Sequence, residues 1–103
     1  MKIKEIKENI KNIYLNVEIV DIEEIRTIES TGDKVCDVKV KDETGEAQSS
    51  IFGEENLSQL KEAKVGDRLV IKSFLARGNY NELVRITSGR YGKIEVVKSW
   101  ILI

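Results

Sequence analysis

The 103-residue sequence contains no histidine, no proline and a single cysteine, Cys36. Without histidine, imidazole-based acid–base and nucleophilic catalysis are excluded. A zinc site draws on several Cys or His ligands, so one cysteine supplies neither such a site nor an internal disulfide. Cys36 alternates in phase with Val38 and Val40, and we interpret it as a small core residue rather than a reactive thiol. These absences predict a protein without metal, cofactor or enzymatic activity.

Long apolar runs are also missing. No segment approaches the roughly 20 apolar residues that cross a bilayer, and the first ten residues mix Ile with Lys and Glu, unlike a secretory signal. We therefore expect a cytoplasmic protein without membrane contact. The 41% apolar and 34% charged fractions are typical of a folded globular protein, and this length allows one domain with a modest core.

The net charge of −1 gives no general attraction to polyanions, but the charges are unevenly distributed. Residues 1–50 hold 8 basic and 12 acidic side chains, whereas residues 51–103 hold 9 and 6. From Arg68 onward the counts are 7 and 2. A basic last third is compatible with a nucleic-acid partner and equally with ordinary solvated charge.

The N-terminal segment predicts an amphipathic helix over residues 1–12, packed on the domain. Its basis is the recurrence of Ile3, Ile6, Ile10 and Ile13 at spacings of three and four, with charged residues between them.

A long first strand follows the N-terminal segment. Leu15, Val17 and Ile19 alternate with polar residues, and the apolar phase then moves to Val20 and Ile22. Such a phase change predicts a bulge or a sharp bend, which a barrel needs where one strand serves both of its sides.

The remaining pattern predicts two hairpins separated by a helix. In order these are a strand around residues 36–41, a turn at 42–45, a strand at 47–52, a helix at 54–61, a strand from 69, a loop at 78–81, a strand at 82–87 and an extended segment at 93–97. This order is that of an OB-fold, an all-β five-stranded Greek-key barrel with a short helix between strands 3 and 4. We assign residues 13–97 to the barrel and residues 98–103 to a C-terminal tail, in which Trp100 is expected to cover apolar surface.

Alternation predicts which face of the barrel functions. Ile51 must point inward to supply the core, so Phe52 points outward. An exposed ring beside polar and basic side chains suits base stacking, with the cations near the phosphates; the alternative is that Phe52 packs under the following helix. The outward polar residues on these two strands are Lys39, Lys41, Gln48 and Ser50.

The second half of the chain adds further candidates. Tyr80 lies in the predicted loop and is expected to contact the ligand rather than to cover a core edge. Phe74 and Leu75 are adjacent, so only one of them faces the groove; strict alternation favours Phe74 and a bulge favours Leu75. The basic residues that would follow the groove are Lys72, Arg77, Arg85, Arg90 and Lys93.

Several runs of the sequence resemble the OB domains of archaeal replication protein A and single-stranded DNA-binding proteins. They are Val40–Ala47, Ile51–Gly53, Val65–Asp67, Val70–Ile71, Glu82–Leu83 and Gly89–Glu95. The resemblance implies a stacking aromatic residue before the glycine that ends strand 3, here Phe52, and another in the loop, here Tyr80. It also implies an aromatic residue late in strand 4, where the sequence offers Phe74 or the departure Leu75.

The resemblance implies sequence-tolerant binding of single-stranded DNA in replication, recombination or repair. It further implies association with other OB domains of a longer polypeptide or with other replication proteins. Two alternatives remain open from the sequence: an OB module that binds RNA or tRNA, and an OB domain that makes protein–protein contacts.

Overall fold

The computed structural model describes residues 1–7, 10–80 and 83–98, with only the backbone of residues 78–80. Its elements in order are η1 (Ile3–Glu5), β1 (Ile13–Ile22), β2 (Arg26–Thr27), β3 (Lys34–Asp42), β4 (Gly45–Phe52), α1 (Glu54–Leu60), β5 (Arg68–Tyr80), β6 (Leu83–Thr87) and β7 (Lys93–Val97). Trp100 lies outside the described residues, and no helix among those described is long and apolar enough to cross a bilayer.

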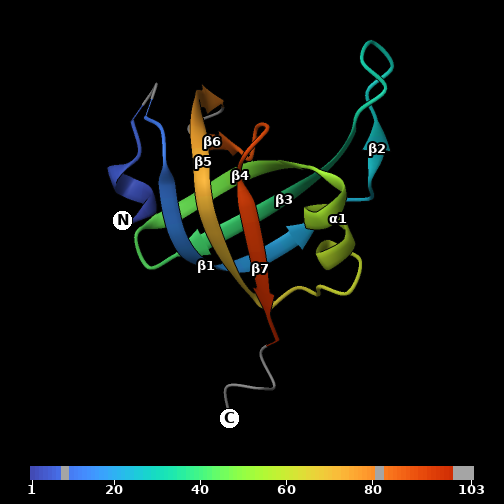
Figure 1. Ribbon diagram of the computed structural model, residues 1–103. Helices are drawn as coiled ribbons and strands as arrows, with labels where there is room; N and C mark the ends of the chain where they lie inside the picture. Colours follow the sequence, from blue (N-terminus) through green and yellow to red (C-terminus); the bar gives the residue numbers. More distant parts are fainter. Residues whose placement is uncertain (8–9, 81–82, 99–103) are drawn as a thin grey trace.

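The strands close into a barrel, as predicted. β1 pairs with β3 and with β5, β3 pairs with β4, and β6 joins β4 to β5. The β4–β6 pairing is parallel and the others are antiparallel. Figure 1 shows β3 and β4 crossing β1, β5 and β7 at a steep angle, with α1 at one end and β2 on a projecting arm. Closure removes most sheet edges, which would otherwise pair with other chains.

The alternation of the first half of the chain is confirmed. Ala47, Ser49 and Ile51 of β4 are all fully buried, whereas the residues between them are half-buried on the outer face. The predicted phase change in β1 is a bulge, because Ile19 pairs with Val40 while Asp21 pairs with Lys39. One strand thereby borders β5 with its first part and β3 with its second.

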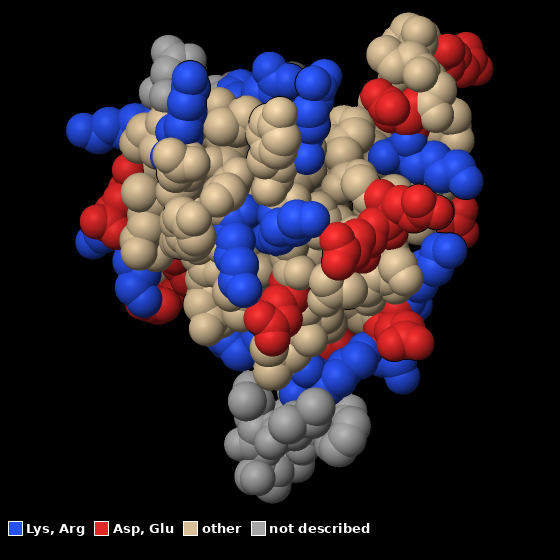
Figure 2. All heavy atoms as spheres, viewed as in Figure 1, with Lys and Arg blue, Asp and Glu red and all other residues tan. Residues whose placement is uncertain are grey.

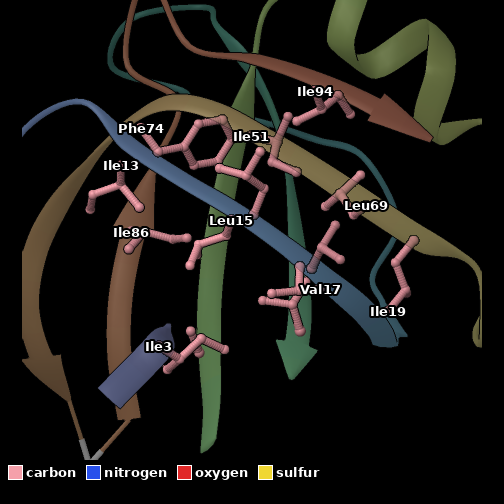
Figure 3. Close-up of a cluster of buried hydrophobic side chains, with 14 of the residues drawn as sticks. Ile3, Ile13, Leu15, Val17, Ile19, Ile51, Leu69, Phe74, Ile86 and Ile94 are labelled. Atoms are coloured by element: carbon pink, nitrogen blue, oxygen red, sulfur yellow. The ribbon is translucent and has the colours of Figure 1, made fainter. Parts of the chain in front are cut away.

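The adjacent residues Phe74 and Leu75 are distinguished by a second bulge. Ile13 pairs with Phe74 and Leu15 with Ile71, so β5 has one residue more than β1 in this stretch, and Ser73 there has a φ of 59°. The bulge reverses the alternation. Phe74 is 0% exposed and points into the apolar cluster of Figure 3 beside Ile51, so it is a core residue and not a ligand contact.

The N-terminal segment differs from the predicted helix. Among the described residues of this segment, 1–7 and 10–12, the helical structure is a 3₁₀ turn over Ile3–Glu5, and Ile13 begins β1. Ile3 and Ile6 are nevertheless buried against the barrel. The periodic spacing of isoleucines reflects this burial; a segment this short is a weak helix in isolation, and here tertiary contacts decide its conformation.

Asp42 attaches this segment to the β3–β4 hairpin. Its carboxylate accepts hydrogen bonds from the backbone N–H groups of Ile3 (2.8 Å) and Thr44 (2.7 Å) and from the Thr44 hydroxyl (2.5 Å). Partial burial acts to raise the pKa of Asp42, but these hydrogen bonds outweigh it, so the pKa lies below its ordinary value. The charged form is therefore the one that the fold stabilises.

Replacing Asp42 with alanine is expected to lower the free energy of unfolding by about 1–2 kcal/mol at pH 7, since hydrogen bonds to a charged group are lost. Because the folded pKa is lowered, this stabilisation is present above the unfolded pKa of about 3.9 and is lost as the pH falls through the folded value. Urea unfolding curves of the two proteins should therefore converge at acidic pH. Glu24→Gln is the control, since Glu24 is exposed and forms no ion pair with any described residue; a gap independent of pH would contradict this role.

The open edge of β7 is covered by side chains of α1. The Gln59 amide donates to the carbonyl of Ile94 (2.7 Å) and accepts from the N–H of Val96 (3.1 Å). Asn56 accepts from the N–H of Ile94 (3.1 Å). These side-chain amides form the hydrogen bonds that a neighbouring strand would otherwise form with the backbone of β7, and they hold α1 beside the end of β4.

Candidate nucleic-acid interface

A groove of about 1110 Å³ lies where the end of β4, α1, the arm that carries β2 and the loop between β6 and β7 meet. Phe52 and Leu57 are among the residues that line it, together with Ile25 from the arm. Four basic and two acidic side chains also line it: Lys34, Lys61, Arg77, Arg90, Asp33 and Glu54. The groove therefore combines an aromatic ring with an excess of positive charge.

Phe52 is held in place through its backbone. Its N–H donates to the Ser88 hydroxyl (2.8 Å), and its carbonyl accepts from the Asn56 amide (2.9 Å). The same Asn56 amide also donates to the carbonyl of Gly92 (2.9 Å), which ties α1 to the β6–β7 loop. The ring is half-buried on the outer side of β4, as the alternation predicted. The backbone that carries the ring is therefore fixed beside the groove, which limits the positions from which the ring can stack on a flat ligand.

The loop between β6 and β7 is compact. The Gly92 N–H donates to the Ser88 carbonyl (2.8 Å), and a Cβ at Gly92 would lie 2.5 Å from that oxygen. Ser88 is buried, while Arg90 and Tyr91 are exposed at the apex of the loop. The backbone of the loop is thus held by this hydrogen bond, and Arg90 at its apex lines the groove.

The basic side chains in the groove differ from most others on the surface. Lys34, Lys61, Arg77 and Arg90 form no ion pair or side-chain hydrogen bond with any residue that the structure describes. Figure 2 shows several Lys and Arg side chains at the upper left and centre of the molecule, acidic side chains on the projecting arm at the upper right, and both kinds intermingled below. Cations that have no partner among the described residues are available to an anionic ligand.

The outer face of β3 and β4 is, by contrast, largely neutralised. Lys39 pairs with Glu46 (3.5 Å) and Lys41 with Glu18 (3.9 Å). Gln48 of β4 lies between Lys39 of β3 and Arg85 of β6. Lys39 and Arg85, two of the ligand contacts predicted from the sequence, therefore lie in one row across the sheet.

Asp37 lies on this same face. It forms an ion pair with Arg26 of the arm (3.1 Å) and accepts a hydrogen bond from the Ser50 hydroxyl (3.0 Å). The hydroxyl of Ser50 is thus already engaged, and Ser50 is not one of the residues that line the groove.

Cys36 lies on the inner side of β3 and is buried. Burial raises the pKa of its thiol, and the charges of Asp37 and Glu23 act in the same direction. The thiol donates to the Glu23 carbonyl at 3.2 Å. Its burial confirms the core assignment. Among the described residues no group of three or more His, Cys, Asp or Glu side chains could hold a metal ion.

Lys72 does not join the groove. It lies opposite Lys93 on the β5–β7 ladder and pairs with Glu95 at 3.6 Å. The first half of β5 borders β1 and β7, and only the half beyond Ser73 borders β6. The predicted contact from Lys72 therefore falls on a different side of the barrel from Arg77.

Leu75 and Arg77 lie in that second half of β5. Leu75 is half-buried and approaches Gly89, where an added Cβ would lie 3.3 Å from the Leu75 Cδ1. Ala76 pairs with Ile86 and Asn79 with Val84, so a third bulge falls at residues 77–78. This bulge accompanies the exposure of Arg77 at the groove.

Tyr80 is not in a loop. β5 extends through it, and its backbone pairs with that of Leu83 of β6. Gly78 and Asn79, whose residue types are typical of turns, are instead accommodated by the bulge. The side chain of Tyr80 lies outside what the structure describes.

Two groove residues were not among the sequence candidates. Lys34 begins β3 after the arm, and Lys61 directly follows α1. In the sequence each resembles any solvated lysine, and only the fold brings them to the same groove as Arg77 and Arg90.

No family model matches the sequence, and no curated protein is similar enough to indicate a family. Solved structures do match. A replication factor A related protein from Methanobacterium thermoautotrophicum is 23% identical with a TM-score of 0.78, covering 94% of this chain and 89% of its own. The OB domain of Ta0387 from Thermoplasma acidophilum is 18% identical with a TM-score of 0.69, covering 94% and 85%.

The chain has an OB-fold. The predicted fold class is confirmed, although β2 and β7 add strands to the five of the barrel. OB-fold structures with bound DNA also match. Fission yeast Pot1 with single-stranded DNA is 11% identical with a TM-score of 0.67, covering 97% of this chain and 40% of its own. HIN domains in complex with double-stranded DNA match as well.

Proposed function

We propose that this OB domain binds single-stranded nucleic acid, DNA in the first place, in the groove beside Phe52, and that it catalyses no reaction. The observation that carries the proposal is the combination of a half-buried ring on a fixed backbone with four basic side chains that have no partner among the described residues. A base stacked on an aromatic side chain contributes about 1–3 kcal/mol, and cations along the groove neutralise phosphates.

A single strand suits this arrangement better than a duplex. Stacking on Phe52 requires a base whose face is accessible, whereas bases within a duplex are stacked on one another. Structures similar in fold bind each kind of DNA, Pot1 the single strand and HIN domains the duplex. The choice between them therefore depends on the groove. Similarity to a replication factor A related protein supports a place in DNA replication, recombination or repair.

The experiment is a titration of labelled oligo-dT and of a duplex of equal length, followed by fluorescence anisotropy at several salt concentrations. We expect oligo-dT to bind more tightly, with a salt slope of about −0.7 for each phosphate contacted. The double variant Arg77→Gln/Arg90→Gln should reduce that slope by about 1.4 in magnitude, because two contacts are lost.

Lys72→Gln is the matched control, since Lys72 lies on the β5–β7 ladder away from the groove. It should leave the slope unchanged. An affinity that is independent of salt concentration would contradict the proposed groove. So would a reduction of the salt slope by Lys72→Gln as large as that by Arg77→Gln/Arg90→Gln.

A parallel titration with oligo-U tests the alternative of an RNA-binding module, because sites dedicated to RNA use the 2′-hydroxyl. Absence of binding to every oligonucleotide would favour a protein-contact domain.

A further inference from the structure

Lys34 lies on one side of Phe52 and Arg77 on the other, and Lys61 lines the same groove directly after α1. Across the end of the sheet Val35 of β3 lies opposite Phe52 of β4, and Lys34 is the residue before Val35. On the opposite flank β4 borders β6, which borders the half of β5 that carries Arg77. The ring therefore lies between Lys34 and Arg77, which belong to different strands.

The two lysines come from different parts of the groove. Lys34 follows the arm that carries β2, and Lys61 follows the last turn of α1. Both are exposed and both line the groove, yet neither forms an ion pair with the acidic residues there, Asp33 and Glu54. Two like charges in one groove repel each other, and a bound anion relieves that repulsion.

We infer that Lys34 and Lys61 form a second phosphate-binding subsite, so that a single strand crosses the ends of the strands and leaves over α1. This inference rests on the proposed function and assigns the path of the ligand. The alternative path follows the outer face of β3 and β4 past Lys39 and Lys41.

Ion pairing decides between these paths. A phosphate that binds Lys39 or Lys41 must displace Glu46 or Glu18, so one ionic contact replaces another with little net gain. A phosphate that binds Lys34 or Lys61 breaks no ion pair among the described residues, and the release of cations from the nucleic acid then drives the association without that cost. Lysine acts as a point charge on a flexible stem, so this subsite holds the phosphodiester backbone without reading the bases.

The test compares two double variants on an oligo-dT length series. Lys34→Gln/Lys61→Gln removes the proposed subsite. Lys41→Gln/Lys64→Gln is the matched control: it makes the same change in net charge at the other end of β3 and three residues beyond Lys61, outside the groove. All four lysines are exposed, so thermal unfolding should confirm that both variants fold as the parent does.

In the unsubstituted protein we expect affinity to rise with oligonucleotide length until the strand spans Arg77 and the proposed subsite. In Lys34→Gln/Lys61→Gln the rise should stop at a shorter length, and the salt slope should fall by about 1.4 in magnitude on long oligonucleotides. The control variant should behave as the parent does.

Two results would overturn the inference. One is unchanged binding of long oligonucleotides by Lys34→Gln/Lys61→Gln while Arg77→Gln/Arg90→Gln still weakens it, which would leave the proposed function intact. The other is a larger loss from the control variant, which would place the strand on the outer face of β3. Absence of oligo-dT binding by the unsubstituted protein would reject the proposed function and this path together.

Discussion

Replacing Phe52 with alanine is expected to weaken oligo-dT binding by about 5- to 150-fold, the equivalent of the 1–3 kcal/mol typical of a stacked base. The ring lies on the outer side of β4 in the groove, so its loss removes the stacking surface while the barrel interior stays filled. The free energy of unfolding should fall by less than the about 3–5 kcal/mol that follows truncation of a buried phenylalanine. Fluorescence anisotropy and urea unfolding measure the two quantities.

Tyr14→Ala is the control for a general effect of losing an aromatic side chain. Tyr14 is 55% exposed on β1, and its hydroxyl hydrogen-bonds with that of Ser73, away from the groove. It should leave oligo-dT binding unchanged. If Phe52→Ala bound normally and lost several kcal/mol of stability, the ring would be structural and the proposed site would be wrong.

Replacing Phe74 with alanine is expected to lower the free energy of unfolding by about 3–5 kcal/mol. The side chain is fully buried, and its removal leaves a cavity beside Ile51 that the closed barrel cannot easily fill. Leu75→Ala is the matched neighbour; because Leu75 is half-buried on the outer face, its truncation should cost less.

Urea unfolding monitored by circular dichroism measures both changes. Phe74→Leu keeps most of the volume and should lose less stability than Phe74→Ala, so the order of the variants remains measurable if the alanine variant is largely unfolded. A greater loss from Leu75→Ala than from Phe74→Ala would contradict the orientation that the Ser73 bulge imposes.

The alternation of apolar and polar residues predicted most of the barrel. Side chains in a strand point to opposite faces in turn, and each strand in the first half of the chain keeps one face apolar. The inward positions of β3 and β4, the outward position of Phe52 and the bulge in β1 all followed from this. The short helix α1 followed from Leu57 and Leu60 at helical spacing.

The same reasoning failed where pairing partners, rather than residue types, set the conformation. Gly78 and Asn79 are typical of a turn, yet they belong to β5 because β6 pairs with it beyond the bulge. Ile3 and Ile6 fit a helix and are held instead in a 3₁₀ turn, with the N–H of Ile3 bonded to Asp42. Pairing energies from residues distant in sequence exceed such local preferences.

The sequence by itself determined that this chain is a small barrel with an aromatic residue on its outer face and a basic last third. Only the tertiary structure decided which cations accompany that ring. Lys34, Lys61, Arg77 and Arg90 are far apart along the chain and share one groove, whereas Lys72 is directed elsewhere by the course of β5. The physical reason is that a charge's partners depend on distances in space, and sequence separation does not fix those distances in a closed barrel.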